Sequence, residues 1–326
     1  MRDLSQSVAP DLSDWVRGKV FCLVGGTGLI GRALADCLRR WDARDVVVVS
    51  RRAADQRPGL TWRGADLVDP QSLSGVLPKD GIVVHLAALK YAGQGALNPD
   101  AFFDLNVRGT WNLLNACREA GVAKFIYAST GLVYGVPARI PVRETDPASP
   151  LSIYAATKLA GETLAHGFAA EFGLPVVIAR LANIYGDSVD PETVWGRILN
   201  LAAGGLDVEL RSLRPERDYL HVNDAAEGLL RLAAAEFPER SVTVNVSTGV
   251  GTSVGRLATI VAEEAGKRGR QPAVLEATPR MEDRIPSLVL DNELLLRTTR
   301  WRPPVTVEAG IRRAFQTLVA ASHARA

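Results

Sequence analysis

The sequence predicts an α/β chain: a Rossmann-like, doubly wound parallel sheet with a smaller, interleaved C-terminal substrate domain. Short apolar runs alternate with segments of helical periodicity through the first half of the 326 residues. Unbroken β-branched runs, such as the four valines at 46–49, are typical of parallel strands covered on both faces. A glycine-rich turn stands between the first apolar run and the first helical segment, as in dinucleotide-binding domains.

The individual elements follow from the same patterns. Strands are expected at residues 19–24, 46–49, 60–63, 82–86, 125–128, 176–179 and 242–246. Helices are expected at 29–41, 100–120, 152–172, 224–235, 257–265, 291–297 and 308–320. This rhythm predicts right-handed crossovers between parallel strands. Two segments, 187–215 and 270–304, are irregular because proline, glycine and charged residues interrupt any period.

The predicted domains are therefore not consecutive. Residues 1–18 form a lead-in, and 19–180 form the dinucleotide domain, to which a segment at about 218–250 returns. Residues 181–217 and 251–326 form the substrate domain.

Composition excludes several classes of protein. Hydrophobic residues make up 47% of the chain and charged residues 23%, which argues against a disordered protein. A net charge of +2 gives no indication of nucleic-acid or membrane-surface binding. No signal-peptide pattern and no apolar run of membrane-spanning length is seen.

Cysteine and histidine usage predicts neither disulfides nor metal. Cys22, Cys37 and Cys117 lie in apolar segments without metal-ligand spacing, so we expect buried thiols and a reducing, cytoplasmic compartment. The four histidines make no cluster with cysteine or acidic residues, and His85 is expected to be a core residue.

The glycine-rich turn reads Gly25-Gly-Thr-Gly28-Leu-Ile-Gly31. In this context Gly25 permits the tight turn, Gly28 lets a pyrophosphate approach the backbone, and Gly31 allows close packing of helix and sheet. The N-terminus of the following helix offers free N–H groups to the phosphates. The turn predicts dinucleotide binding.

The end of the second strand carries Ser50, Arg51 and Arg52 where an NAD site usually has an acidic residue. Arginine offers donors suited to a phosphate, so NADP is predicted over NAD; the alternative is a pair of solvated loop charges. Asp66, after the third strand, is a candidate for binding the adenine amine or for capping a helix before Pro70.

A tyrosine and a lysine lie four residues apart, at Tyr154 and Lys158, and hence on one face of a predicted helix. A lysine ammonium lowers the pKa of a nearby phenol, which can then move a proton at a carbinol oxygen while hydride moves at carbon. The segment 127–135, with Ser129 and Thr130, leaves the carboxyl end of the fifth strand, where α/β sheets build their sites.

These motifs together resemble the extended short-chain dehydrogenase/reductase family, of the NAD(P)-dependent epimerase/dehydratase type that includes UDP-galactose 4-epimerase and nucleotide-sugar 4-ketoreductases. The resemblance spans about residues 19–318. It is carried by the glycine-rich turn and by the segments at 85–90, 106–110, 129–135, 154–158, 180–186 and 217–224.

The resemblance implies a role for each matching residue. Tyr154 is the acid/base, Lys158 lowers its pKa and holds the nicotinamide ribose, and Thr130 binds the reacting oxygen. The substrate-binding positions are Lys90, Thr130, Asn183, Arg217 and Arg280, of which Arg217, Arg280 and Lys90 have surface salt bridges or solvation as alternatives. The cofactor-binding positions are Gly25, Thr27, Gly28, Leu29, Ile30, Gly31, Ser50, Arg51, Arg52, Asp66, Leu67, Ala87, Ala88, Lys90, Asn106, Ser129, Tyr154 and Lys158.

Departures from the family narrow the expected chemistry. Gly131 and Leu132 stand where the dehydratase branch carries Asp-Glu, and no cysteine lies in that loop for 3,5-epimerisation. What remains is hydride exchange at C4 of a nucleotide-linked hexose, as a 4-ketoreductase or 4-epimerase. The alternatives are an NADPH-dependent reductase of a non-sugar ketone or aldehyde, and a non-enzymatic NADP-binding sensor.

Two further expectations concern surfaces. The family often dimerises through the helices after Asn106 and around Tyr154, so a homodimer is expected; Leu113, Leu114, Ile153 and Leu164 would serve that interface or the core equally. Trp195 lies in the irregular segment, where it covers the substrate or packs in the core.

Overall fold

The fold was analysed in a computed structural model that describes residues 11–51, 57–90, 98–186, 193–269, 271–276 and 285–323. A seven-stranded sheet forms its centre, with the order β10-β6-β5-β4-β1-β2-β3 and every neighbouring pair parallel. The strands are β1 (Val20–Val24), β2 (Asp45–Ser50), β3 (Thr61–Gly64), β4 (Ile82–His85), β5 (Lys124–Thr130), β6 (Val176–Leu181) and β10 (Ser241–Val246). The predicted doubly wound parallel sheet is confirmed.

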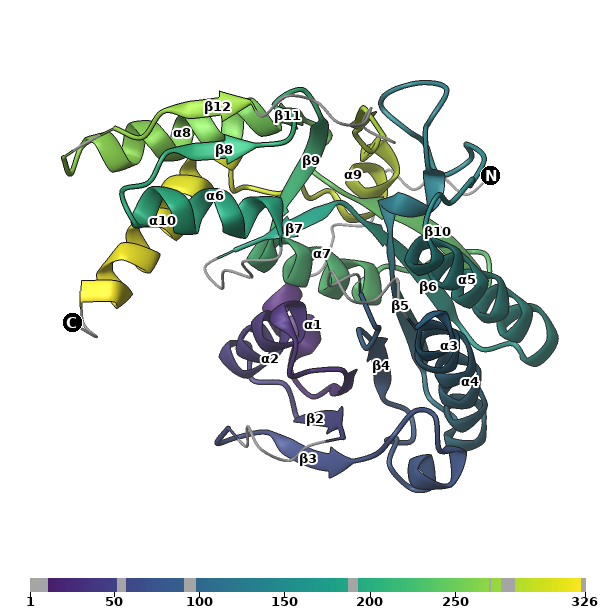
Figure 1. The fold of residues 1–326 in the computed structure, drawn as a ribbon. Helices are drawn as coiled ribbons and strands as arrows, with labels where there is room; N and C mark the ends of the chain where they lie inside the picture. Colours follow the sequence, from purple (N-terminus) through teal and green to yellow (C-terminus); the bar gives the residue numbers. More distant parts are fainter. Residues whose placement is uncertain are drawn as a thin grey trace.

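Helices cover both faces of this sheet (Figure 1). Alternate side chains of β1 divide between two hydrophobic clusters: Phe21 and Leu23 belong to one, Cys22 and Val24 to the other. The first cluster includes side chains of α1 (Leu12–Val16), α2 (Leu29–Arg40), α7 (Val222–Ala234) and α9 (Glu293–Thr299). The second includes side chains of α4 (Gly109–Ala120) and α5 (Ile153–Phe172).

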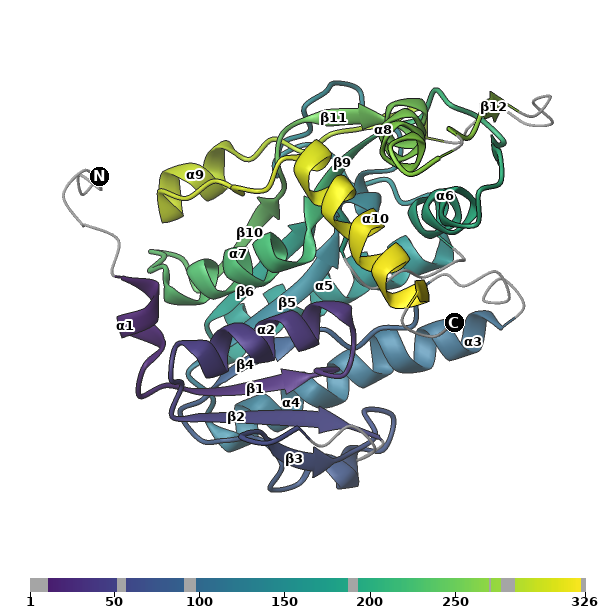
Figure 2. The ribbon, with the colours of Figure 1, turned by 90° about the vertical axis from the view of Figure 1, so that its left-hand side faces the viewer.

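A second body lies beyond the carboxyl ends of the strands (Figure 2). Its core joins α6 (Val194–Ala203), α8 (Val254–Gly266) and α10 (Val307–His323). Two small sheets accompany them, made of β7 (Asn183–Tyr185), β9 (Glu216–His221), β11 (Gly251–Ser253) and β13 (Ser287–Leu288), and of β8 (Val208–Leu210) and β12 (Val274–Glu276). Strand β10 follows β9 in sequence yet pairs with β6, so the chain returns from the second body to the main sheet.

The irregular segments hold more structure than predicted. Helix α6 was not expected between residues 187 and 215, although Trp195, Ile198 and Leu199 are buried at helical spacing and Thr193 caps its first turn. The helix expected at 100–120 is divided into α3 (Pro99–Phe102), a π-helical turn (Phe103–Arg108) and α4. Helix α1 falls within the expected lead-in.

Helix α5 approaches β5 unusually closely at Gly161. A Cβ atom built on Gly161 would lie 2.1 Å from the Tyr127 hydroxyl oxygen, and the fully buried Tyr127 ring has no room to retreat. Gly167, two turns further along the same helix, has no neighbouring atom within 4 Å of such a Cβ. This contact sets the distance between α5 and the sheet.

We therefore predict that Gly161→Ala lowers the free energy of unfolding by about 1–3 kcal/mol through overpacking. Gly167→Ala is the matched control, and alanine's higher helix propensity should stabilise it by up to about 1 kcal/mol. Urea titration followed by circular dichroism measures both. Equal effects of the two substitutions would contradict the close contact.

Candidate active site

The glycine-rich turn has the geometry of a phosphate cradle. Gly25 has a φ of +84°, and a Cβ there would lie 2.6 Å from the Ala87 nitrogen. A Cβ on Gly31 would lie 2.5 Å from Gly26 Cα, so helix and turn touch through bare backbone. Gly28 is the exposed N-cap of α2 with no side-chain cap, which leaves the first N–H groups of the helix for an anion. The residues present fit the pyrophosphate of a dinucleotide.

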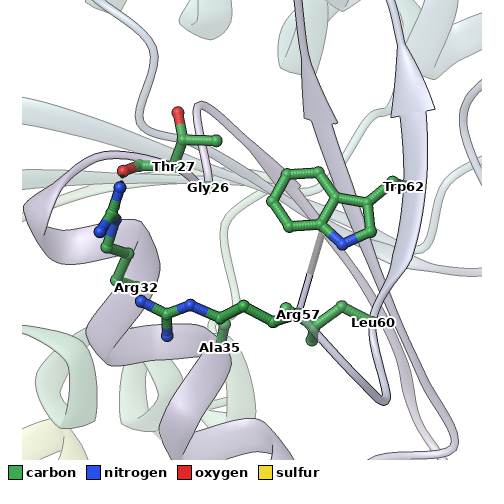
Figure 3. Close-up of a pocket in the computed structure, with 7 residues that line it drawn as sticks. All are labelled: Gly26, Thr27, Arg32, Ala35, Arg57, Leu60 and Trp62. Atoms are coloured by element: carbon green, nitrogen blue, oxygen red, sulfur yellow. Dashed lines mark hydrogen bonds between the residues drawn. The ribbon is translucent and has the colours of Figure 1, made fainter. Parts of the chain in front are cut away.

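Beside this turn is a pocket that the sequence did not indicate (Figure 3). Its lining residues are Gly26, Thr27, Arg32, Ala35, Arg57, Leu60 and Trp62. Arg32 donates through Nε to the Thr27 carbonyl at 2.8 Å, and Arg57 pairs with Asp36 at 3.1 Å. The two arginines place positive charge near the glycine-rich turn. Leu29 and Ile30, in the first turn of α2, are partly buried.

The residues expected at the adenosine end lie at the carboxyl ends of β2 and β3. Ser50 ends β2, Arg51 follows it and is exposed, and Arg52 lies outside the described residues. Asp66 accepts from the Val68 N–H at 3.0 Å, whereas Asp69 caps the turn at Pro70. The alternative role of Asp66 as that cap is therefore wrong.

Leu67, also expected at the cofactor, is buried. Its carbonyl accepts from Asn112 Nδ2 at 2.8 Å, and its side chain would be 3.0 Å from a Cβ on Gly109. These contacts hold the chain after β3 against α4.

Asn106 ties the loop after β4 to helix α5. Its side chain exchanges hydrogen bonds with Leu89, at 2.7 Å to the N–H and 3.0 Å to the carbonyl, and donates to Thr157 Oγ1 at 3.0 Å. The side chain is buried and comes from the π-helical turn, a distortion often found at functional sites. Ala87 lies beside the glycine-rich turn, where its N–H donates to the Val24 carbonyl at 3.0 Å, and Ala88 and the exposed Lys90 follow it.

Tyr154 lies in the first turn of α5, which Ser152 caps by accepting from the Ala155 N–H. Burial raises the pKa of Tyr154 to about 12, while a hydrogen bond with Thr130 acts in the opposite direction. Thr130 ends β5, and its Oγ1 also accepts from the Leu132 N–H at 3.2 Å. The structure brings the expected tyrosine and threonine together, with the tyrosine as a neutral phenol at pH 7.

Lys158 lies one helical turn beyond Tyr154 and is almost completely buried. Its Nζ is 4.0 Å from the centroid of the Tyr127 ring, an arrangement that stabilises the ammonium. Burial nevertheless lowers the pKa of Lys158 to about 7, against the opposing effect of the Glu162 carboxylate. The expected lowering of the Tyr154 pKa is therefore not found in the chain alone, because burial dominates at both groups.

A buried ion pair next to Lys158 was missed in the sequence. Glu162 accepts from Ser129 Oγ and pairs with Arg180, whose Nη2 is 2.7 Å from Glu162 Oε2. Ser129 and Arg180 are register partners on β5 and β6, so the carboxylate lies over a pair of neighbouring strands. The spacing of Tyr154, Lys158 and Glu162, four residues each, was the signal that could have revealed it.

Of the two arginines expected to bind the substrate, the structure describes Arg217. Arg217 donates to the carbonyls of Glu216 and Ile285, at 2.8 Å and 2.7 Å. Asp218 faces the other way along β9 and accepts from Thr248 and Gly249, so the alternative of a salt bridge between Arg217 and Asp218 is wrong. Arg280 lies outside the described residues.

Gly131 and Asn183 line one small pocket next to Thr130, together with Leu290 and Asp218. A Cβ on Gly131 would lie 2.9 Å from Leu290 Cδ1. The position that carries an acidic residue in the dehydratases therefore faces a packed leucine.

Other singled-out residues belong to the core. His85 is fully buried, with Nε2 3.0 Å from Thr110 Oγ1, and all three cysteines are buried thiols. Trp195 packs edge-to-face on Tyr185 in the core of the second body, which settles its role in favour of packing. Within the described ranges, no three metal-ligating side chains gather, and no helix is long and apolar enough to cross a membrane.

Comparison with known proteins agrees with this geometry. The curated UDP-glucose 4-epimerase of Rhizobium leguminosarum bv. trifolii is 30% identical over 323 residues, which cover 91% of this chain and 97% of that protein. The crystal structure of the Thermus thermophilus UDP-glucose 4-epimerase with NAD matches with a TM-score of 0.80 at 32% identity, covering 93% and 99% of the two chains. The Thermotoga maritima UDP-glucose 4-epimerase with UDP-glucose matches with a TM-score of 0.83 at 25% identity, over 93% and 99%.

A family model for the NAD dependent epimerase/dehydratase family matches residues 21–247, from the first strand to the last strand of the main sheet. The chain is an enzyme of the NAD dependent epimerase/dehydratase family.

Proposed function

We propose that this enzyme exchanges hydride at C4 of a nucleotide-linked hexose, as a UDP-hexose 4-epimerase. The observation that carries the proposal is the pairing of Tyr154 with Thr130 at the end of β5, beside the buried Lys158. The named functions of relatives that match almost the whole chain support the sugar nucleotide as substrate.

In this proposal each residue acts on the sugar hydroxyl or on the proton that leaves it. The bound nicotinamide supplies the acceptor and donor of hydride at the reacting carbon. Tyr154 removes the proton of the 4-hydroxyl. It returns the proton after the 4-keto sugar has rotated to present its opposite face to the cofactor. Thr130 binds the same oxygen, and the Lys158 ammonium favours the phenolate of Tyr154. Asn106 and the glycine-rich turn hold the cofactor in place.

Dehydration is a poorer fit for the same site. Elimination of water needs an acid and a base close to the reacting sugar. Gly131 supplies neither, and Leu290 occupies the space into which a side chain at that position would grow.

A second candidate, net reduction of a 4-keto sugar, is favoured by the end of β2. Ser50 stands where a ribose-binding acid is expected for NAD, and Arg51 follows it. Arg32 and Arg57 line the pocket near the glycine-rich turn. An enzyme that consumes NADPH releases its cofactor in each turnover, whereas an epimerase retains it. For the nucleotide, we propose binding by Asn183 and by Arg217 and Arg280, the two arginines on the diphosphate.

We also propose a homodimer through α4 and α5. These helices lie side by side on one face of the sheet (Figure 1), and Trp111, Ile153 and Phe172 are exposed on them. Leu113 and Leu114 are completely buried within the single chain, so they belong to the core rather than the interface. Leu164 is partly buried against the same core.

Tyr154→Phe should lower kcat for interconversion of UDP-galactose and UDP-glucose by about 10²–10⁴-fold, because the proton at the 4-hydroxyl loses its acceptor. Affinity for NADH, followed by its fluorescence, should stay near normal. Tyr219→Phe removes the hydroxyl group of a buried tyrosine in the core of the second body and is the matched control. Full activity of Tyr154→Phe would refute the assignment.

Arg51→Ala should weaken binding of NADPH by about 10–100-fold, because a charge-assisted hydrogen bond to the 2′-phosphate is lost. NADH lacks that phosphate and serves as the control ligand, with unchanged affinity. Fluorescence titration with both cofactors measures the ratio. An equal loss for both cofactors, or none, would exclude Arg51 as a phosphate ligand.

Trp111→Asp should shift the protein from dimer to monomer, because a charge replaces an exposed aromatic side chain on the proposed α4–α5 interface. Light scattering coupled to size-exclusion chromatography measures the mass. Leu206→Asp changes a similarly exposed apolar residue outside α4 and α5 and should leave the mass unchanged. A Trp111→Asp protein of unaltered dimeric mass would contradict this interface.

A further inference from the structure

Helix α5 carries a third polar residue on its catalytic face, which the proposed mechanism does not use. Tyr154, Lys158 and Glu162 are spaced four residues apart and therefore form one stripe along the helix. Glu162 is 2% exposed. A carboxylate so deeply buried is costly unless charged or hydrogen-bonding groups surround it.

Three donor atoms of two side chains, one on each of two neighbouring strands, surround the Glu162 carboxylate. Ser129 Oγ, on β5, donates to Oε1. From β6, Arg180 donates through Nε at 3.1 Å to Oε1 and through Nη2 at 2.7 Å to Oε2. The guanidinium itself lies 4.7 Å from the centroid of the Tyr134 ring, and its Nη1 donates to the Glu144 carbonyl at 3.4 Å. Because arginine keeps its proton, it places a permanent positive charge against this carboxylate.

The Glu162 carboxylate also acts electrostatically on Lys158, which lies one turn before it on α5. The groups that act on the Lys158 ammonium are Glu162 on its own helix, the Tyr127 ring on β5 and His85 on β4. On β6, Arg180 is paired with Glu162. Burial drives the pKa of His85 well below its usual value, so it is neutral. Glu162 is then the negative charge that offsets the desolvation of the Lys158 ammonium.

We propose that Glu162 is a positioning residue whose carboxylate favours the ammonium form of Lys158 and holds the Ser129 side chain beside Thr130. Its Arg180 partner holds the carboxylate in place, and the charge of that carboxylate acts on the lysine. This proposal rests on the proposed role of Lys158 only for its effect on cofactor binding. Its effect on the proton of Lys158 can be measured without any ligand.

The first test is a double-mutant cycle in unfolding, measured at each pH between 6 and 9.5. It compares the wild type, Lys158→Met, Glu162→Gln and the double variant. A lysine with a lowered folded pKa binds fewer protons in the folded than in the unfolded state. Its contribution to stability therefore rises with pH, up to tenfold in the unfolding equilibrium constant per pH unit, between its folded pKa and that of the unfolded chain.

In the wild-type background, the stability difference from Lys158→Met should begin to rise near pH 7. In the Glu162→Gln background, the same rise should begin at least about one pH unit lower, because an opposite charge has been removed. An onset at the same pH in both backgrounds would overturn the proposal. Other titrating groups cancel in the cycle.

The second test measures the affinity for NADH as a function of pH by fluorescence. The dissociation constant of the wild type should increase as Lys158 loses its proton, and this increase should move to lower pH in Glu162→Gln. Lys158→Met should abolish the pH dependence. If Lys158→Met keeps it, the proposed role of Lys158 fails; if only the Glu162→Gln shift is absent, the role of Glu162 fails.

Two further variants separate electrostatics from packing. Glu264→Gln alters another buried carboxylate that pairs with an arginine, in the second body, and should leave both pH profiles unchanged. If Glu162→Gln does not fold because Arg180 is left unpaired, Glu162→Gln with Arg180→Gln replaces the ion pair by neutral amides. In that background, the stability difference from Lys158→Met should still begin to rise at a lower pH than in the wild type. A rise that begins at the wild-type pH would overturn the proposal.

Discussion

The site depends on one close contact, between helix α5 and strand β5. Gly161 lets the helix backbone approach the Tyr127 ring to a distance that no side chain permits. Tyr127 in turn donates to the Lys158 carbonyl at 3.3 Å, and its ring lies under the Lys158 ammonium. The same aromatic residue therefore sets the height of the helix above the sheet and provides the surface on which the lysine rests. This contact also fixes the positions of Tyr154 and Glu162, because they lie one helical turn on either side of Lys158.

Close packing has an electrostatic consequence that the residue types alone do not reveal. Removing water raises the pKa of Tyr154 to about 12 and lowers that of Lys158 to about 7, so both shifts favour the neutral forms. A neutral phenol can donate a proton but cannot accept one. In the proposed mechanism, the phenolate that acts as base would form when positive charge is present in the site, from a protonated Lys158 and from an oxidised cofactor. In such a site, the buried Glu162 controls how much of the lysine is charged.

The sequence revealed those parts of the site that depend on local pattern. The glycine-rich turn, the Tyr154–Lys158 spacing and the parallel strands are short-range features, and each was found where it was predicted. Glu162 was missed because its partners, Ser129 and Arg180, come together only through the register of β5 and β6. The short strands β7, β11 and β13 of the second body were missed because two or three residues are too few to show a period. Arg217 could not be placed because its carbonyl partner Ile285 is 68 residues away.

Packing also narrows the chemistry at the carboxyl end of β5. Thr130 is followed by Gly131, whose Cα faces Leu290, and Leu290 belongs to a small cluster with Val133, Tyr134 and Val142. Introducing a carboxylate at residue 131 would require Leu290 to move and would bring a charge against that apolar cluster, which is costly. The packing of Leu290 therefore disfavours an acidic side chain at residue 131. The family resemblance implies an acidic pair at residues 131 and 132 for dehydration, where this chain has glycine and leucine. The structure adds that an acidic side chain at residue 131 would require changes at Leu290 as well.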